Sequence, residues 1–108
     1  MIRGDFVTVA IQGDFSKPRP ALLIQSDRFN EHATMTVLLL SSMLVDAPLL
    51  RVTVQPSDKN GLQKTSQVMI DKAMTIKRDK LGEAFGSAGD ELMLEIGRCL
   101  AVFLGIAR

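Results

Sequence analysis

The sequence predicts a mainly β fold that ends in one helix, arranged as a small twisted barrel or sandwich that the helix caps. The first two-thirds of the chain consists of short β-rich runs separated by turn residues. The last fifth changes to helical spacing, with Leu92, Ile96, Leu100 and Phe103 every three or four residues. The 108 residues suit one domain, 1–108, and their 46% hydrophobic content is typical of globular proteins.

Three apolar runs are the first strand candidates, at residues 6–11, 21–25 and 34–40. In the first run the apolar residues alternate, so Val7 and Val9 share one face of the strand. Gly and Pro residues after it break the pattern, as they do in turns. The second run is almost wholly apolar, and the third begins with β-branched residues.

The next runs continue the sheet. Residues 50–54 are apolar at the first, third and fifth positions and polar between them. Such alternation suits a half-buried strand of an antiparallel sheet. Segment 56–61 has the composition of a loop. Two further short strands are predicted at residues 67–71 and 73–77.

The C-terminal helix has a candidate start at Ser87, because Ser87 with Asp90 three residues later resembles a capping box. Residues such as Val102 widen the apolar surface beyond a single stripe. Two interpretations remain open. The helix packs between the sheet and a neighbouring loop, or it also contributes to an oligomer interface.

Charge and residue counts exclude several classes of protein. With 13 Lys+Arg against 12 Asp+Glu, the net charge of +1 excludes a polybasic nucleic-acid binder, so any RNA or DNA site must be local. Cys99 and His32, the sole Cys and His, cannot supply the three or four ligands of a zinc site. We therefore expect no metal and no cofactor. Cys99 lies in an apolar run and is interpreted as a core residue.

No signal peptide precedes the first strand, and no apolar stretch is long enough to span a bilayer. One Cys cannot form an internal disulfide, so nothing points to secretion. These features predict a cytoplasmic protein without membrane contact.

Arg19 is the most informative polar residue. It lies between Pro18 and Pro20, which stiffen its backbone at the entrance to a strand. Its guanidinium is always charged, and its planar fork of donors matches a phosphate. A rigidly held arginine suits stabilisation of a phosphorane-like transition state. The alternative is a surface arginine in a salt bridge.

Short motifs follow one another along nearly the whole chain: Arg3-Gly4-Asp5, Arg19-Pro20 running into residues 21–27, Phe29-Asn30, Leu40-Ser41-Ser42, Val68-Met69-Ile70-Asp71 and Thr75-Ile76. Their order resembles the MazF/PemK toxin family. The resemblance implies an SH3-like barrel with a C-terminal helix (the fold shared with CcdB) and a homodimer. It also implies metal-independent endoribonuclease activity on single-stranded mRNA, and a cognate antitoxin that occupies the RNA groove.

Three residues match catalytic positions of that family. Arg19 matches its catalytic arginine. Ser41 matches a catalytic threonine, with Ser42 as the rival because the match needs a one-residue gap. Asp71 matches an acidic residue that some members use. The implied reaction is attack of the RNA's own 2′-OH on the adjacent phosphate, which needs neither a metal nor an enzyme nucleophile.

RNA binding has its own candidates. Local positive charge comes from Lys17, Arg28 and Lys72, besides Arg19. The chain has no Trp or Tyr, so base stacking is assigned to Phe15 or Phe29. The chain departs from the family in lacking a Glu in its first loop and in having Met74 where many members have an arginine.

Two other functions remain. The related CcdB family shares the fold but poisons DNA gyrase through a Trp-Gly-Ile ending, where this chain has Leu104 in place of Trp. Because large aromatic residues anchor interfaces better than Leu, this alternative is the weaker one. The third possibility is an inactive barrel that serves as a binding module.

Overall fold

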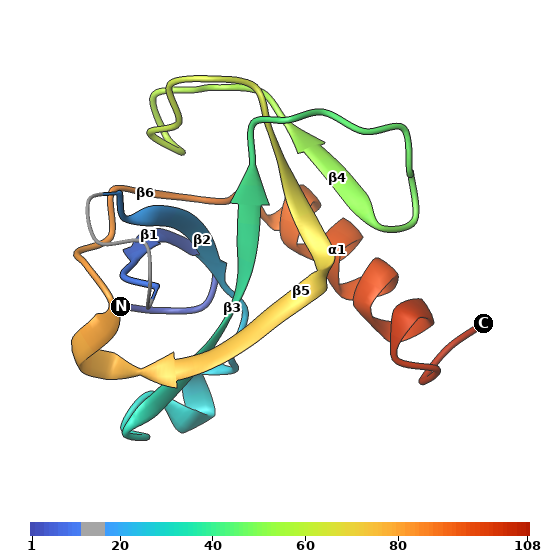
Figure 1. Cartoon of the computed structure of the whole chain (residues 1–108). Coiled ribbons are helices and arrows are strands. Elements are labelled where there is room, and N and C mark those ends of the chain that lie inside the picture. Colours follow the sequence, from blue (N-terminus) through green and yellow to red (C-terminus); the bar gives the residue numbers. More distant parts are fainter. Residues whose placement is uncertain (12–16) are drawn as a thin grey trace.

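The computed structural model covers the whole chain and describes residues 1–11 and 17–108. The strands in this part form one sheet in the order β4-β5-β3-β2-β1-β6, and every pair of neighbours is antiparallel (Figure 1). The elements are β1 (Asp5–Val9), β2 (Arg19–Leu23), η1 (Asp27–Phe29), β3 (Thr34–Ser41), β4 (Arg51–Val54), β5 (Ser66–Lys77), η2 (Arg78–Lys80), β6 (Gly86–Ser87) and α1 (Asp90–Phe103).

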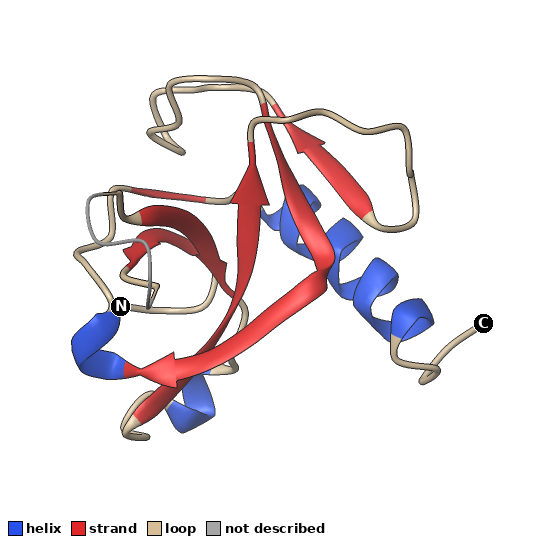
Figure 2. Ribbon diagram, in the orientation of Figure 1, coloured by secondary structure: helices blue, strands red, loops and turns tan. Residues whose placement is uncertain are grey.

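The sheet curls into a half-barrel with α1 beside it (Figure 2). A bridge between Val9 and Leu81 draws the chain after η2 back against β1. The predicted mainly β fold with a C-terminal helix is therefore confirmed. Within the described residues, no helix is long and apolar enough to cross a membrane.

Both faces of the central strands are buried, which explains why the run at residues 21–25 is almost wholly apolar. Leu22 packs in the core that contains Ile96 of α1, whereas Ala21 and Leu23 pack in a second core on the other face. Val7 and Val9 share this second core, as the alternation in the first run predicts.

The two strands predicted at residues 67–71 and 73–77 are one strand, β5, of 12 residues. Its pairing with β3 shifts register between Leu38, opposite Ala73, and Leu40, opposite Val68. Figure 1 shows β5 bending midway. Extra residues on one strand bend it locally, so the break seen in the sequence marks a bulge, not a loop.

The predicted start of the helix is wrong. Ser87 belongs to β6, and the residue that caps α1 is Gly89, without a side-chain hydrogen bond. Ser87 instead uses its backbone N–H, which donates to the Lys59 carbonyl at 2.9 Å. Within the predicted apolar stripe Ile96 is fully buried, but Phe103 is 49% exposed at the end of the helix.

Candidate active-site groove

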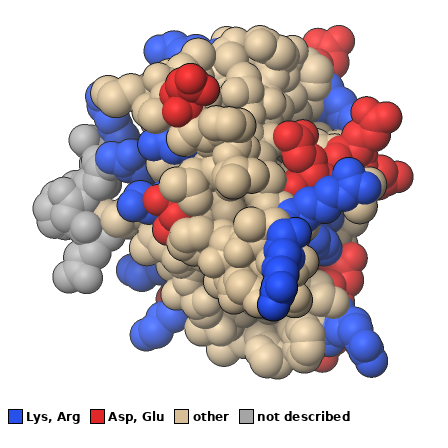
Figure 3. All heavy atoms as spheres, turned by 90° about the vertical axis from the view of Figure 1, so that its right-hand side faces the viewer, with Lys and Arg blue, Asp and Glu red and all other residues tan. Residues whose placement is uncertain are grey.

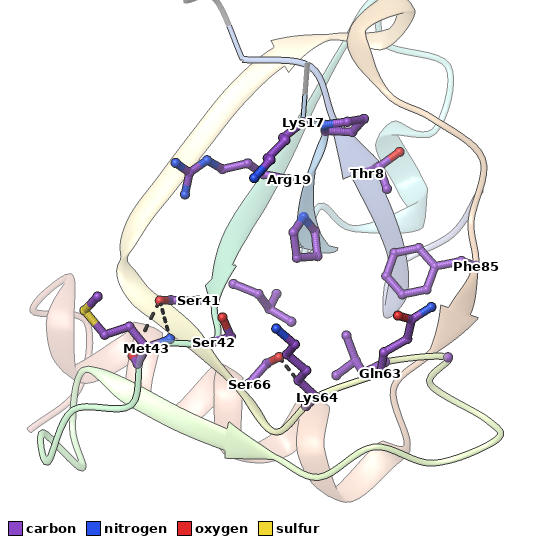
Figure 4. A pocket seen from close by; sticks show the side chains of 15 residues that line it. Thr8, Lys17, Arg19, Ser41, Ser42, Met43, Gln63, Lys64, Ser66 and Phe85 are labelled. Carbon is purple, nitrogen blue, oxygen red and sulfur yellow. Dashed lines mark hydrogen bonds between the residues drawn. The ribbon is translucent and has the colours of Figure 1, made fainter. Parts of the chain in front are cut away.

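A groove of about 880 Å³ opens at the edge where β2 begins and β3 ends. We call it the Arg19 groove. Figure 4 shows Arg19 and Ser41 on one side of it and Phe85 and Gln63 on the other. Its described lining residues are Thr8, Lys17, Pro18, Arg19, Pro20, Leu40, Ser41, Ser42, Met43, Gly61, Leu62, Gln63, Lys64, Ser66 and Phe85.

The pairing of β2 with β3 brings Arg19 and Ser41 together. Ala21 of β2 lies opposite Leu39 of β3. Arg19 begins β2 and Ser41 ends β3, each two residues beyond this last pair, so both lie at the same end of the two antiparallel strands and line the same groove. The backbone of Arg19 pairs with Val9 of β1, which fixes the position of Arg19 at the start of β2.

The described lining of the Arg19 groove is positively charged. Lys17, Arg19 and Lys64 contribute cations, and none of the described lining residues is Asp, Glu or His. In a protein with a net charge of only +1, this is the local concentration of charge that a nucleic-acid site requires. The arrangement can bind a phosphate and stabilise additional negative charge on it.

Ser41 lies in a tight turn with Met43. The backbone N–H of Met43 donates to Ser41 Oγ at 3.1 Å, and that hydroxyl lies 3.5 Å from the Met43 carbonyl oxygen. Ser42 is exposed between them. Both hydroxyls line the Arg19 groove, so the choice between them stays open.

Gln67 supports this turn, a role that the sequence analysis did not predict. Its side chain is buried, and its amide both accepts from the Val45 N–H and donates to the Val45 carbonyl, each at 3.0 Å. Arg51 adds a bond from its guanidinium to the Met43 carbonyl at 3.2 Å and another to Gln67 at 3.2 Å. Together they tie the β3–β4 loop to β5 and β4. Gln67 lies in an apolar run, and only long-range pairing shows its partners.

Three other predicted site residues do not line the Arg19 groove. Asp71 and Lys72 lie near the bend of β5 and pair with each other at 3.7 Å. Arg28 is in η1, which precedes β3, whereas Ser41 is at the far end of that strand. Phe15, like Asp14, falls within residues 12–16, outside the described residues.

The ring of Phe29 packs edge-to-face on His32, with centroids 5.3 Å apart, in the region of Arg28. Neither ring lines the Arg19 groove.

Burial, with a contribution from Glu95, raises the pKa of the Cys99 thiol above its usual value, so the thiol stays protonated at neutral pH. Within the described residues, no three or more His, Cys, Asp and Glu side chains gather as metal ligands.

A second surface lies away from the Arg19 groove. Figure 3, seen from the right-hand side of Figure 1, shows a broad area without charge among scattered groups of both signs. Loop 43–50 and the end of α1 expose large apolar side chains, including Leu49 and Phe103. Six residues border a hollow of about 420 Å³ that we call the loop–helix patch: Ala47, Pro48, Leu49, Leu50, Val102 and Phe103.

Comparisons with known proteins show which proteins the sequence and the fold resemble. A protein described as probable endoribonuclease MazF from Mycolicibacterium smegmatis is 44% identical over 108 residues, covering 99% of each chain. An endoribonuclease in complex with its cognate antitoxin from Mycobacterial species has a TM-score of 0.84 and 25% identity, with 100% of this chain and 98% of that one covered. MazF in a MazE–MazF crystal structure from Deinococcus radiodurans has the same fold, with a TM-score of 0.80 and 22% identity over 99% and 97% of the chains.

These relatives favour the ribonuclease hypothesis over the gyrase poison. The family model for the PemK-like, MazF-like toxin of type II toxin–antitoxin systems matches residues 2–104. The chain therefore belongs to the PemK/MazF family of toxin endoribonucleases of type II toxin–antitoxin systems.

Proposed function

We propose that this toxin cleaves single-stranded mRNA in the Arg19 groove by a metal-independent transesterification. The RNA's 2′ oxygen forms a bond to the adjacent phosphorus while the bond to the 5′ oxygen breaks. The 2′ proton leaves, and the 5′ oxygen gains a proton. The products are a 2′,3′-cyclic phosphate and a 5′-OH end. The observation that carries the proposal is that Arg19 and Ser41 line the same side of a basic groove.

Arg19 and a serine hydroxyl supply the stabilisation in this reaction. The guanidinium binds the phosphate oxygens as their negative charge grows, and a hydroxyl from Ser41 or Ser42 donates to the same phosphate. Asp71 was the candidate base, but it does not line the Arg19 groove. The described lining of the groove therefore supplies groups that stabilise the transition state, and it includes no carboxylate that could remove the 2′ proton.

The product and its metal dependence test the proposal. Single-stranded RNA incubated with the toxin in excess EDTA should be cut and should carry 2′,3′-cyclic phosphate ends. An RNA with a 2′-deoxy nucleotide at the cut position should resist cleavage there, because its attacking hydroxyl is missing. Intact RNA under all conditions, or cleavage of the deoxy substrate, would contradict the mechanism.

Paired serine variants should identify the catalytic hydroxyl. Ser41→Ala and Ser42→Ala each remove one hydroxyl, and loss of the one that binds the phosphate should lower kcat about tenfold to a hundredfold. Ser41 also accepts from the Met43 N–H, so Ser41→Thr is the control that keeps a hydroxyl in this turn. If both alanine variants retain wild-type kcat, neither serine has the assigned role.

An antitoxin and a location complete the proposed function. The related endoribonuclease that was solved with its cognate antitoxin supports a dedicated protein inhibitor for this toxin as well. We infer that such an inhibitor blocks the Arg19 groove, since its cations would attract acidic residues as they attract phosphate. A cytoplasmic location follows from the mRNA substrate.

We further infer a homodimer that buries the loop–helix patch, whose Leu49 and Phe103 are 65% and 49% exposed in one chain. Phe103→Glu would place a charge in this interface, and light scattering after size exclusion should then show a monomer. Phe29→Glu, at another exposed phenylalanine, should leave the dimer intact. A wild-type protein that is monomeric at high concentration would contradict the inference.

A further inference from the structure

Phe85 is the one aromatic side chain among the described residues that line the Arg19 groove. It is 38% exposed. The sequence assigned base stacking to Phe15 or Phe29, but Phe29 packs on His32 outside the groove. The structure therefore offers a different aromatic surface, on the same groove as Arg19.

The ring of Phe85 is held from behind by the core. Phe6 is fully buried, and its ring stacks with Phe85 at a centroid distance of 6.2 Å and an interplanar angle of 28°. The backbone N–H of Phe85 donates to the Phe6 carbonyl at 2.9 Å. One side of the ring thus rests on the core, and the exposed part borders the groove. A platform that is already ordered loses little side-chain entropy when it binds a ligand.

The loop on the other side of Phe85 is equally well ordered. Asn60 is buried, and its side chain accepts from the N–H groups of Ser57 at 3.0 Å and Leu62 at 2.9 Å and donates to the Gln55 carbonyl at 2.8 Å. These bonds fix the tip of the loop at Gly61. Gly61 has φ +69°, and a Cβ there would lie 3.0 Å from Phe85 Cδ1. The tip therefore packs closely against Phe85.

Gln63 follows this tip and faces Phe85 across the rim of the groove in Figure 4. Its exposed amide offers a donor and an acceptor, the pattern that can hydrogen-bond to the edge of a base. Lys64 comes next and supplies a positive charge for the backbone of the same ligand. A stacking surface, an edge-reading amide and a cation thus border one space.

We propose that Phe85 and Gln63 form a base-binding subsite for single-stranded RNA, in which one nucleobase stacks on Phe85 while the backbone runs past Lys64 toward Arg19. This subsite deepens the proposed function and rests on it for the identity of the ligand. The described lining has three cations and no carboxylate, and an aromatic ring beside them suits a nucleic acid, which has both phosphates and π-faces.

The composition of the chain makes a direct test possible. The protein has no Trp and no Tyr, so Phe85→Trp introduces its sole strong fluorophore at the subsite. The probes are random-sequence 2′-O-methyl RNA octamers, which lack the attacking hydroxyl, and abasic octamers with the same phosphates. The base-containing octamers should quench the indole emission in a saturable manner, whereas the abasic ones should not. Phe29→Trp is the matched control, and its emission should stay unchanged.

A second variant keeps the test independent of how tryptophan fits. Phe85→Leu retains an apolar contact with Phe6 but removes the stacking face. It should weaken octamer binding and raise KM for RNA cleavage about tenfold to a hundredfold with a smaller change in kcat, while Phe29→Leu should change neither. Equal quenching by abasic octamers, or an unchanged KM in Phe85→Leu, would overturn the subsite.

The two proposals fail in different ways. If wild-type protein cuts no RNA but base-containing octamers quench Phe85→Trp, the reaction is wrong and the base-binding subsite stands. If wild-type protein cuts RNA and an acidic peptide, rather than an octamer, quenches Phe85→Trp, the subsite is a protein-binding surface and our assignment to RNA is wrong.

Discussion

Arg19→Ala should lower the rate of RNA cleavage about 10²- to 10³-fold, because it removes the group that stabilises the charge developing on the phosphate. The loss should appear in kcat more than in KM, since Lys17 and Lys64 still attract the RNA backbone. Single-turnover cleavage of a labelled RNA at saturating protein measures this step directly. Far-ultraviolet circular dichroism should show an unchanged fold.

Two further variants make this result specific. Arg19→Lys keeps the charge but loses the planar fork, so it should recover only part of the lost rate. Arg28→Ala removes an arginine near the opposite end of β3 and should leave kcat unchanged. If Arg28→Ala is as damaging as Arg19→Ala, the reaction does not take place in the Arg19 groove. Wild-type kcat in Arg19→Ala would exclude the assigned role.

The sequence predicted well what depends on local pattern. Alternation placed Val7 and Val9 on one face, and helical spacing placed Ile96 in the apolar stripe of the helix that packs on the sheet. The predictions from the sequence failed where pairing between distant segments decides which element a residue belongs to. The break between residues 67–71 and 73–77 is a bulge opposite β3, and Ser87 belongs to β6 because it pairs with Asp5 of β1 instead of capping α1.

The same distinction applies to the site. Arg19 and Ser41 could be predicted from the sequence because each stands at the end of a recognisable strand, and antiparallel pairing of β2 with β3 brings these two ends to the same edge of the sheet. Gln63 and Phe85 could not be predicted as site residues from the sequence, since they lie in loops that meet only in the folded chain. Asp71 matched the family by position, yet the bend of β5 leaves it outside the Arg19 groove. Local pattern thus predicts the strand ends that border the groove better than the loops that surround them.

Ile96→Ala should lower the free energy of unfolding by about 2–5 kcal/mol, because it leaves a cavity where α1 meets the sheet. Ile96 is fully buried, with a relative exposure of 0%. It packs in the core cluster that contains Phe6, Leu38 and Ile70. It is the one fully buried side chain of α1, so the attachment of the helix depends on it more than on its neighbours. Urea denaturation at one fixed protein concentration measures the change, since unfolding of a dimer varies with concentration.

Graded variants separate packing from helix propensity. Ile96→Val removes one methylene and should cost about 0.5–1.5 kcal/mol, while Glu95→Ala, at the exposed preceding residue, should stay within about 0.5 kcal/mol of wild type. Since Ala favours helices more than Ile does, a loss in Ile96→Ala cannot come from propensity. A loss below about 1 kcal/mol would mean that α1 is not held by this contact. The same helix ends in Phe103, so a loosened α1 should also weaken any dimer that buries the loop–helix patch.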